Sequence, residues 1–251
     1  MFKKYFEDLQ KDLLKKVSGE TGAAKKTGAK KPAKAPSAGR AAAKKKDTGS
    51  GHAPLRETME KMVRPDLNVE MCRIIDSSGY TPEGIDLVLY RPLYRDMASL
   101  MGGYIPFELV HGTIHVCPRV NAKSAVDALS RVIQAKKINR FSENQDDYPI
   151  IPSFVIGYQS DMSLAEFKNY ILDYYTTKGV EHAFEFDIWV ILGKGLVIKN
   201  WREKRSFVAI ESGKDTLMWF FILINEYLEV ERKNMLDLRD YVQSPEPYKE
   251  Y

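Results

Sequence analysis

The sequence has few cysteines and no long hydrophobic run. Its 251 residues include only Cys72 and Cys117, too few for a disulfide framework, which favours a reducing compartment. The longest apolar run, 217–224, is far shorter than the roughly 20 residues that a membrane-spanning helix needs. Charged side chains stand where the apolar stretch of a secretory signal would lie. We therefore expect a cytoplasmic protein without a transmembrane segment.

Large apolar side chains are missing from residues 18–53, which contain no Phe, Tyr, Trp, Val, Leu, Ile or Met. Such a segment cannot bury enough apolar surface to offset the entropy of ordering it, so we predict a disordered linker. Acidic residues are missing from its central part, 21–46, which holds nine cations. They are Lys25, Lys26, Lys30, Lys31, Lys34, Arg40, Lys44, Lys45 and Lys46.

This basic arm hides the charge of the remaining chain. Removing its nine cations from the formal net charge of +4 leaves −5 for the rest. Lysines displace counterions from a polyanion, an attraction that does not depend on sequence and weakens with salt. We predict that the arm contacts nucleic acid, with DNA as the favoured ligand. The alternative is a solvated linker that only keeps the protein soluble.

Residues 1–17 show the apolar spacing of an amphipathic helix. The side chains on its apolar face are Phe2, Tyr5, Phe6, Leu9 and Leu13. Such a face must be covered, and we expect the helix to dock on the body of its own chain. A protein partner or an anionic membrane surface is the alternative.

From residue 54 the pattern is that of a globular α/β domain, which we place at 54–243 with a tail at 244–251. Helices are expected at 54–65, 122–138, 164–175 and 215–230, and strands at 69–75, 85–90, 107–116, 154–158, 188–192, 196–198 and 206–211. The first two strands should form a hairpin, 91–104 an irregular connection, and Gly193-Lys194-Gly195 a hairpin turn. Pro118 should close the third strand. Irregular alternation of strands and helices predicts a mixed sheet flanked by helices.

Several stretches of the chain together resemble a known family. They are residues 5–10, 56–57, 84–90, 104–108, 190–195 and 215–221. Their order resembles the nuclease core of the PD-(D/E)xK superfamily and, more narrowly, an uncharacterised bacterial and phage family of unknown function built on that core. The resemblance implies a restriction-endonuclease-like α/β fold.

The same resemblance implies a metal site. Such sites use converging carboxylates to hold Mg²⁺ and a lysine that acts on the attacking water. Asp86 fits the carboxylate of the second strand, and Glu57 fits the acidic residue of the first core helix. On the third strand, His115 and Cys117 stand where a Glu-x-Lys pair is expected. Neutral imidazole is a poor Mg²⁺ ligand and a thiol lacks the ammonium charge, so we predict that conventional nuclease activity is lost.

Three alternatives keep chemistry at this site. A lysine could be relocated to Lys123, with Mg²⁺ bound by Asp86 and Glu57. A softer metal could bind the face shared by His111, Thr113, His115 and Cys117, although His111 lies roughly 13 Å from His115 along an extended strand. A Cys117 nucleophile could pair with a His115 base. Against these stands an inert face, in which the thiol is a small buried hydrophobe and the histidine is hydrogen-bonded in the core.

The function predicted from these features is a nuclease-derived, catalytically inactive nucleic-acid-binding protein that needs no cofactor. By analogy it would belong to a defence or phage-host conflict system. A metal-dependent nuclease with a relocated lysine and an interaction or assembly protein are the alternatives. The three tryptophans, Trp189, Trp201 and Trp219, could stack on bases, but Trp189 and Trp219 lie in apolar runs and are expected in the core.

Overall fold

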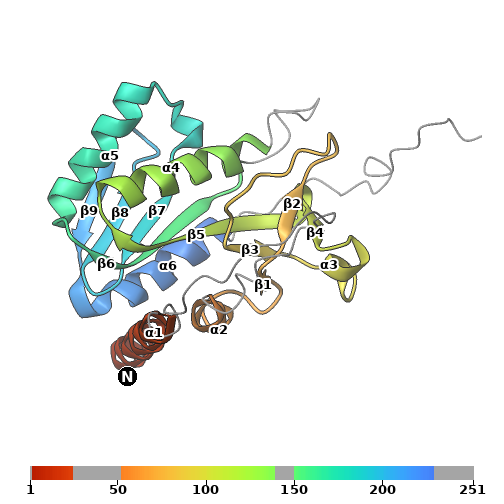
Figure 1. Cartoon of the computed structure of the whole chain (residues 1–251), viewed down its shortest axis with the longest axis horizontal. Helices are drawn as coiled ribbons and strands as arrows, with labels where there is room; N and C mark the ends of the chain where they lie inside the picture. The colour runs from red at the N-terminus through yellow and green to blue at the C-terminus, as the bar shows by residue number, and fades with distance from the viewer. Residues whose placement is uncertain (1, 25–51, 139–149, 229–251) are drawn as a thin grey trace, which may run out of the picture.

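The computed structural model describes residues 2–24, 52–138 and 150–228. Its main element is a seven-stranded mixed sheet in the order β1-β3-β5-β6-β7-β8-β9 (Figure 1). These strands are β1 (Asn68–Glu70), β3 (Leu87–Tyr90), β5 (Val110–Val120), β6 (Ser153–Ser160), β7 (Ile188–Ile191), β8 (Gly195–Lys199) and β9 (Phe207–Glu211). Helices cover both faces of the sheet.

Three parallel strands form the centre of this sheet. β5 pairs with β6, and β6 with β7, in parallel, and such connections need a crossover segment. Helix α4 (Ala122–Lys136) lies between β5 and β6 in sequence, and α5 (Leu164–Lys178) lies between β6 and β7. Both crossovers move the chain one strand in the same direction across the sheet. Because such connections are almost always right-handed, α4 and α5 lie on the same face (Figure 1). The predicted mixed sheet flanked by helices is confirmed.

The opposite face of the sheet is covered by a different set of helices. They are α1 (Phe2–Ala24), α2 (Ala53–Glu60) and α6 (Thr216–Leu228). On β7, Ile188 and Val190 pack into the core on this side, whereas Trp189 and Ile191 pack with α4 and α5. Successive strand side chains point to opposite faces, so one apolar strand serves both cores.

Helix α1 packs against α2 and α6 through one apolar face. Its buried apolar side chains are Phe6, Leu9, Leu13 and Val17. The prediction placed Phe2 and Tyr5 in the same face, but they remain 54% and 51% exposed. The helix also continues to Ala24, past the predicted end at residue 17. The rest of the predicted linker, 25–51, and the tail at 244–251 lie outside the described residues.

Gln10 ties α1 to the start of α6. Its side chain is buried, and its Oε1 accepts the N–H of Leu217 at 3.0 Å. Its Nε2 donates to the carbonyl of Gly213 at 3.4 Å, in the 3-10 turn η4 (Gly213–Asp215). The first N–H groups of a helix have no partner within the helix, so Gln10 satisfies one of those of α6. A polar side chain is thus accommodated within an apolar interface.

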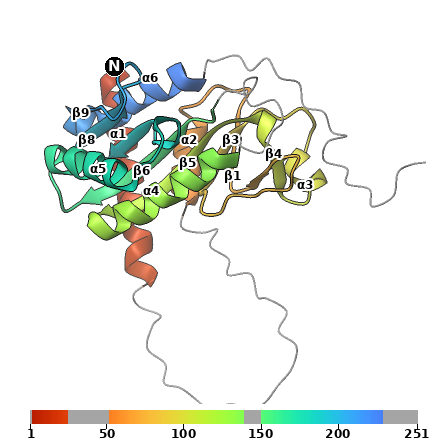
Figure 2. The ribbon, with the colours of Figure 1, turned by 90° about the horizontal axis from the view of Figure 1, so that it is seen from above.

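The first predicted strand is divided in two. β1 pairs antiparallel with β3 as the predicted hairpin requires, but β2 (Arg73–Ile75) pairs in parallel with β4 (Tyr104–Pro106) in a separate two-stranded sheet. The connection 91–104, expected to be irregular, contains α3 (Met97–Leu100). Both views place α3 and β4 at the end of the molecule away from α5 (Figures 1 and 2). Strands of three residues are too short to produce an alternation pattern in the sequence.

β5 is longer than predicted, because Pro118 does not end it. The strand runs to Val120 and stays paired with β6 over this length. On its other side, β3 reaches only as far as Ile114, which pairs with Leu87. Proline cannot donate a ladder hydrogen bond, and it is tolerated where no strand lies opposite. Beyond Ile114, no described strand covers this edge of β5.

Most of the remaining elements lie where they were predicted, including α4, α5 and the β7–β8 hairpin. Gly193 in that hairpin has a φ of +77°, a conformation that glycine adopts without strain. The prediction for Trp219 is wrong, since this α6 side chain is 41% exposed. Among the described helices, none has the length and hydrophobicity needed to cross a bilayer.

We predict that Leu13→Ala destabilises the protein, because Leu13 is 1% exposed between α1 and the body of the chain. Removing a buried leucine leaves a cavity and costs about 2–5 kcal/mol. Urea unfolding of the full chain measures this loss, with the exposed Lys15→Ala on the same helix as the control. An unfolding free energy equal to that of the control would mean that α1 does not contribute to the folded body.

Candidate functional site

The candidate site lies where β3 begins and β5 continues alone. Asp86 immediately precedes β3, and its backbone N–H donates to the carbonyl of Ile114 at 3.0 Å, which extends the ladder by one residue. At the next position of the ladder the Asp86 side chain replaces the backbone as acceptor, because its Oδ2 accepts the N–H of Val116 at 2.6 Å. The carboxylate thus supplies the acceptor that a longer β3 would have supplied.

Arg131 on α4 completes the same edge of β5. Its Nη1 donates to Asp86 Oδ2 at 2.9 Å and to the Gly84 carbonyl at 3.1 Å. Its Nη2 donates to the Val116 carbonyl at 2.8 Å. A guanidinium presents several N–H groups in one plane, so this side chain neutralises the carboxylate and satisfies two carbonyls together. The Asp86 and Arg131 side chains are only 18% and 29% exposed, which limits screening by solvent.

Gly84 provides the space that Arg131 occupies. Its φ of +77° lies in the left-handed region, which favours glycine. A Cβ at this position would lie 2.4 Å from Arg131 Cδ and 2.8 Å from its Cγ. Any side chain on Gly84 would therefore displace the arginine from the carboxylate.

His52 contacts the second oxygen of Asp86. It immediately precedes α2, and its Nε2 lies 3.3 Å from Asp86 Oδ1. Arg131 and the Val116 N–H donate to Oδ2, and His52 lies beside Oδ1, so both oxygens of the carboxylate have a partner. An unpaired carboxylate would be costly next to the apolar β3, and side chains from two helical segments supply the partners of Asp86.

His115 is fully buried beside this group. Its Nδ1 lies 3.0 Å from the Gly84 carbonyl and its Nε2 lies 3.4 Å from Thr113 Oγ1. A carbonyl can only accept, which assigns the ring proton to Nδ1. Burial, followed by the nearby Arg131 charge, lowers the pKa of His115 to about 4. The imidazole is therefore neutral at pH 7 and acts as a hydrogen-bonded core residue.

Cys117 is 2% exposed and packs beneath α4 and α5. Its Sγ lies 3.8 Å from the Arg119 carbonyl on the same strand, as a weak donor. Burial raises the pKa of the thiol, which keeps it protonated. A protonated, enclosed thiol is a poor nucleophile, so this geometry does not favour the predicted cysteine–histidine pair.

The predicted four-residue face of β5 is interrupted at His111. Residues 112 and 110 pair with consecutive residues of β3, which makes His111 the extra residue of a β-bulge. A bulge breaks the alternation of side chains along a strand. Thr113 and His115 share a face, as their contact shows, but strand alternation no longer places His111 with them.

The other predicted site residues lie apart from this cluster. Glu57 is exposed on α2, and its carboxylate lies 3.2 Å from the Lys16 ammonium group. Lys123 is exposed on the first turn of α4. Within the described residues, neither makes a hydrogen bond or ion pair with Asp86, and no three His, Cys, Asp or Glu side chains converge to hold a metal ion. The donors present at Asp86 do not fit Mg²⁺, because an arginine already takes the place of a cation.

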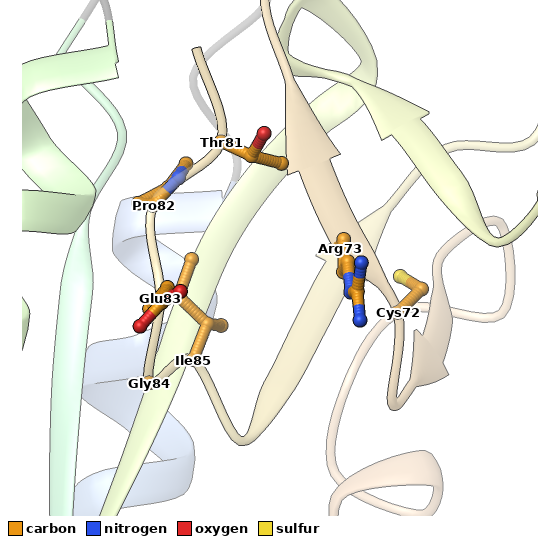
Figure 3. Close-up of a pocket in the computed structure, with 7 residues that line it drawn as sticks. All are labelled: Cys72, Arg73, Thr81, Pro82, Glu83, Gly84 and Ile85. Atoms are coloured by element: carbon orange, nitrogen blue, oxygen red, sulfur yellow. The ribbon is translucent and has the colours of Figure 1, made fainter. Parts of the chain in front are cut away.

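A pocket of about 370 Å³ adjoins the Asp86 cluster. Figure 3 shows the loop 81–85 along one wall, with Cys72 and Arg73 on the other. Gly84 belongs both to this wall and to the hydrogen-bonded group around Asp86. Burial raises the pKa of the Cys72 thiol to about 12, so it supplies no thiolate there. The predicted site residues do not line this pocket.

The prediction from sequence missed Arg131 and His52. The signal for Arg131 was weak but present: it lies three residues after Ala128 and one before Val132, both buried residues of α4. An arginine at the border of a buried face, near an aspartate that needs a partner, is a candidate for that partner. His52 ends a segment without apolar pattern, and nothing in the sequence connects it to Asp86.

Comparisons with known proteins agree with the fold. No protein-family model matches the chain, and no curated protein matches it. Among solved structures, the chain is similar to NucC of P. aeruginosa ATCC27853 in its cAAA-bound form, at 13% identity over 96% of both chains with a TM-score of 0.66.

Two structures of NucC from E. coli MS115-1 are similar as well. The cAAA-bound form is 14% identical over 96% of both chains, with a TM-score of 0.65. The apo form is 16% identical over 77% of this chain and 89% of that one, with a TM-score of 0.61. At these identities the likeness establishes the fold alone, and it supports the predicted restriction-endonuclease-like class.

We predict that His115→Asn reduces the loss of stability in acid. Its amide can still donate to Gly84. The unfolded state takes up a proton near pH 6.5 and the folded state only near pH 4, so wild-type stability is complete above pH 6.5 and falls as the pH drops toward 4. The histidine accounts for roughly 3 kcal/mol of that fall.

Urea unfolding at several pH values between 4 and 8 tests this difference. The pH 8 values give the effect of the substitution on packing, and the two proteins should diverge only below pH 6.5. Parallel curves over the whole range would show that His115 is not held neutral in the folded protein.

Proposed function

We propose that this chain is a nuclease-derived nucleic-acid-binding protein that lacks catalytic activity and acts in a defence or phage-host conflict system. The observation that carries the proposal is the Arg131 guanidinium on the Asp86 carboxylate, at 2.9 Å. Asp86 is the residue that the family resemblance assigns to metal binding. In this chain its negative charge is neutralised by a side chain of the protein.

The charges and burial around Asp86 support inactivity. A divalent cation would have to displace Arg131, and otherwise the two like charges would repel at short distance. The neighbouring strand offers a buried neutral histidine and a buried protonated thiol in place of Glu and Lys. Neither residue supplies a hard oxygen ligand or an ammonium group.

The fold supports the proposed derivation of the protein from a nuclease. The fold of the cAAA-bound NucC structures resembles that of this chain over 96% of its length. The narrower membership in an uncharacterised bacterial and phage family belongs to the same proposal. So does a cytoplasmic location, which fits the free state of Cys72 and Cys117.

The basic arm supports nucleic-acid binding. Residues 21–46 hold nine cations and no acid, in a chain whose remaining net charge is −5. Binding through such a segment is electrostatic, and it depends on backbone phosphates rather than on base sequence. An interaction protein without nucleic-acid affinity is the remaining alternative, and it would not need this separation of charge.

We predict that the full chain binds DNA with a strong salt dependence and that deleting residues 21–46 weakens this binding about tenfold or more at low salt. Fluorescence anisotropy over a series of salt concentrations measures both effects. A variant with the nine cations changed to glutamine keeps the length of the arm and should behave like the deletion. Equal affinity and equal salt dependence in all three proteins would remove the arm from the proposal.

The same samples test for catalysis. Incubation of DNA and RNA with Mg²⁺ or Mn²⁺ should leave both intact. Cleavage that disappears in Asp86→Ala would instead support a nuclease with a relocated lysine.

A further inference from the structure

The loop between β8 and β9 carries an exposed tryptophan among cations. Trp201 is 48% exposed, and Arg202, Lys204 and Arg205 are exposed as well. Glu203 is the one acid between them. Within the described part of the chain, none of the three cations forms an ion pair. The loop therefore presents an aromatic ring beside three cations and one acid, a net charge of +2 over 202–205.

The Trp201 ring is held in a fixed position. Its Nε1 donates to Tyr227 Oη at 3.0 Å, and the His182 ring meets it edge-on at 5.5 Å. The Lys199 Nζ lies over the ring, 3.8 Å from its centroid, which is a cation–π contact. Lys199 covers one face of the ring, while the residue as a whole stays 48% exposed.

Lys199 is itself fixed from below. It is 2% exposed, and its Nζ donates to the carbonyl of His182. Two buried carboxylates act on this lysine. Glu185 attracts Lys199 electrostatically. Asp187 also attracts it and forms a 2.6 Å ion pair with the fully buried Lys136. Burial lowers the pKa of Lys199 to about 8, so it remains largely a cation at pH 7. The support under the ring is therefore charged, buried and hydrogen-bonded.

Hydrogen bonds within the loop also hold its backbone. Asn200 N–H donates to the Ser206 carbonyl at 2.9 Å, and Asn200 Oδ1 accepts the N–H of Arg202 at 3.1 Å. A binding surface that is ordered before its ligand arrives loses little conformational entropy when the ligand binds. The Trp201 ring and its neighbouring cations have this property.

We propose that this loop is a binding platform for single-stranded nucleic acid, with a base stacked on the exposed part of the Trp201 ring and phosphates bound by Arg202, Lys204 and Arg205. Aromatic stacking combined with a basic surface is the usual means of binding unpaired strands. In a duplex the bases stack on one another and are closed to the ring, so the platform selects single strands. The inference rests on the proposed nucleic-acid binding and adds a folded surface to the basic arm.

Trp219 provides a matched control for Trp201. It is similarly exposed, at 41%, but it lies on α6, which contains no lysine or arginine. An exposed tryptophan without cations lacks the phosphate-binding part of the platform. If exposed aromatic surface alone bound the strand, both residues would matter.

Anisotropy of a labelled oligothymidine with the full chain tests the platform. Trp201→Ala should weaken binding about 5- to 150-fold, the range that corresponds to the loss of one stacked base. Trp201→Phe, which keeps an aromatic face, should recover much of the affinity, and Trp219→Ala should bind like wild type. With a duplex of the same length, Trp201→Ala should change binding far less.

Separate controls distinguish the outcomes. Thermal unfolding of each variant shows whether it is folded. The double variant Arg202→Glu/Lys204→Glu changes two exposed side chains and leaves the packed ring unaltered, and it should also weaken single-strand binding. Trp201→Ala that binds like wild type would overturn the platform while leaving the arm as the binding element. Equal losses on single strand and duplex would also overturn it, because stacking would then not be the cause. No binding by the wild-type chain would contradict both the platform and the proposed function.

Discussion

The bond between the Asp86 carboxylate and the Arg131 guanidinium is the constraint around which the candidate site is organised. β5 continues past the point where β3 begins, which leaves the N–H and carbonyl of Val116 facing an edge without a strand. Asp86 accepts from one and Arg131 donates to the other, so the ion pair closes the edge as a strand residue would. Because Arg131 comes from α4, the same bond fixes that helix over the sheet.

The altered residues of β5 follow from this arrangement. Burial, and after it the Arg131 charge, lowers the pKa of His115, so the imidazole stays neutral beside the ion pair. The face to which the family resemblance assigns a metal site is filled by protein side chains. The chain therefore keeps a nuclease-like fold while the position expected for the metal is taken by an arginine. The proposed binding would then depend on charges elsewhere, in the arm and on the β8–β9 loop.

Much of the fold was predictable from sequence, because long apolar patterns are read reliably. The positions of β6, β7, α4, α5 and the turn at Gly193 all follow from runs of five or more residues or from local turn chemistry. The errors arise where tertiary context decides. Pro118 is compatible with a strand only because one edge is free, and the three-residue β2 and β4 leave too little pattern to detect. Asp86 was identified through the family resemblance, whereas Arg131 pairs with it across 45 positions and gave only a weak local signal.

Titration of Mn²⁺ into the full chain by isothermal calorimetry tests the central claim most directly. If Arg131 occupies the cation position at Asp86, the wild-type protein shows no stoichiometric Mn²⁺ site that depends on this carboxylate, and Asp86→Asn gives the same trace. Stoichiometric binding by the wild type that Asp86→Asn abolishes would contradict the claim, because Asp86 would then be free to bind a metal.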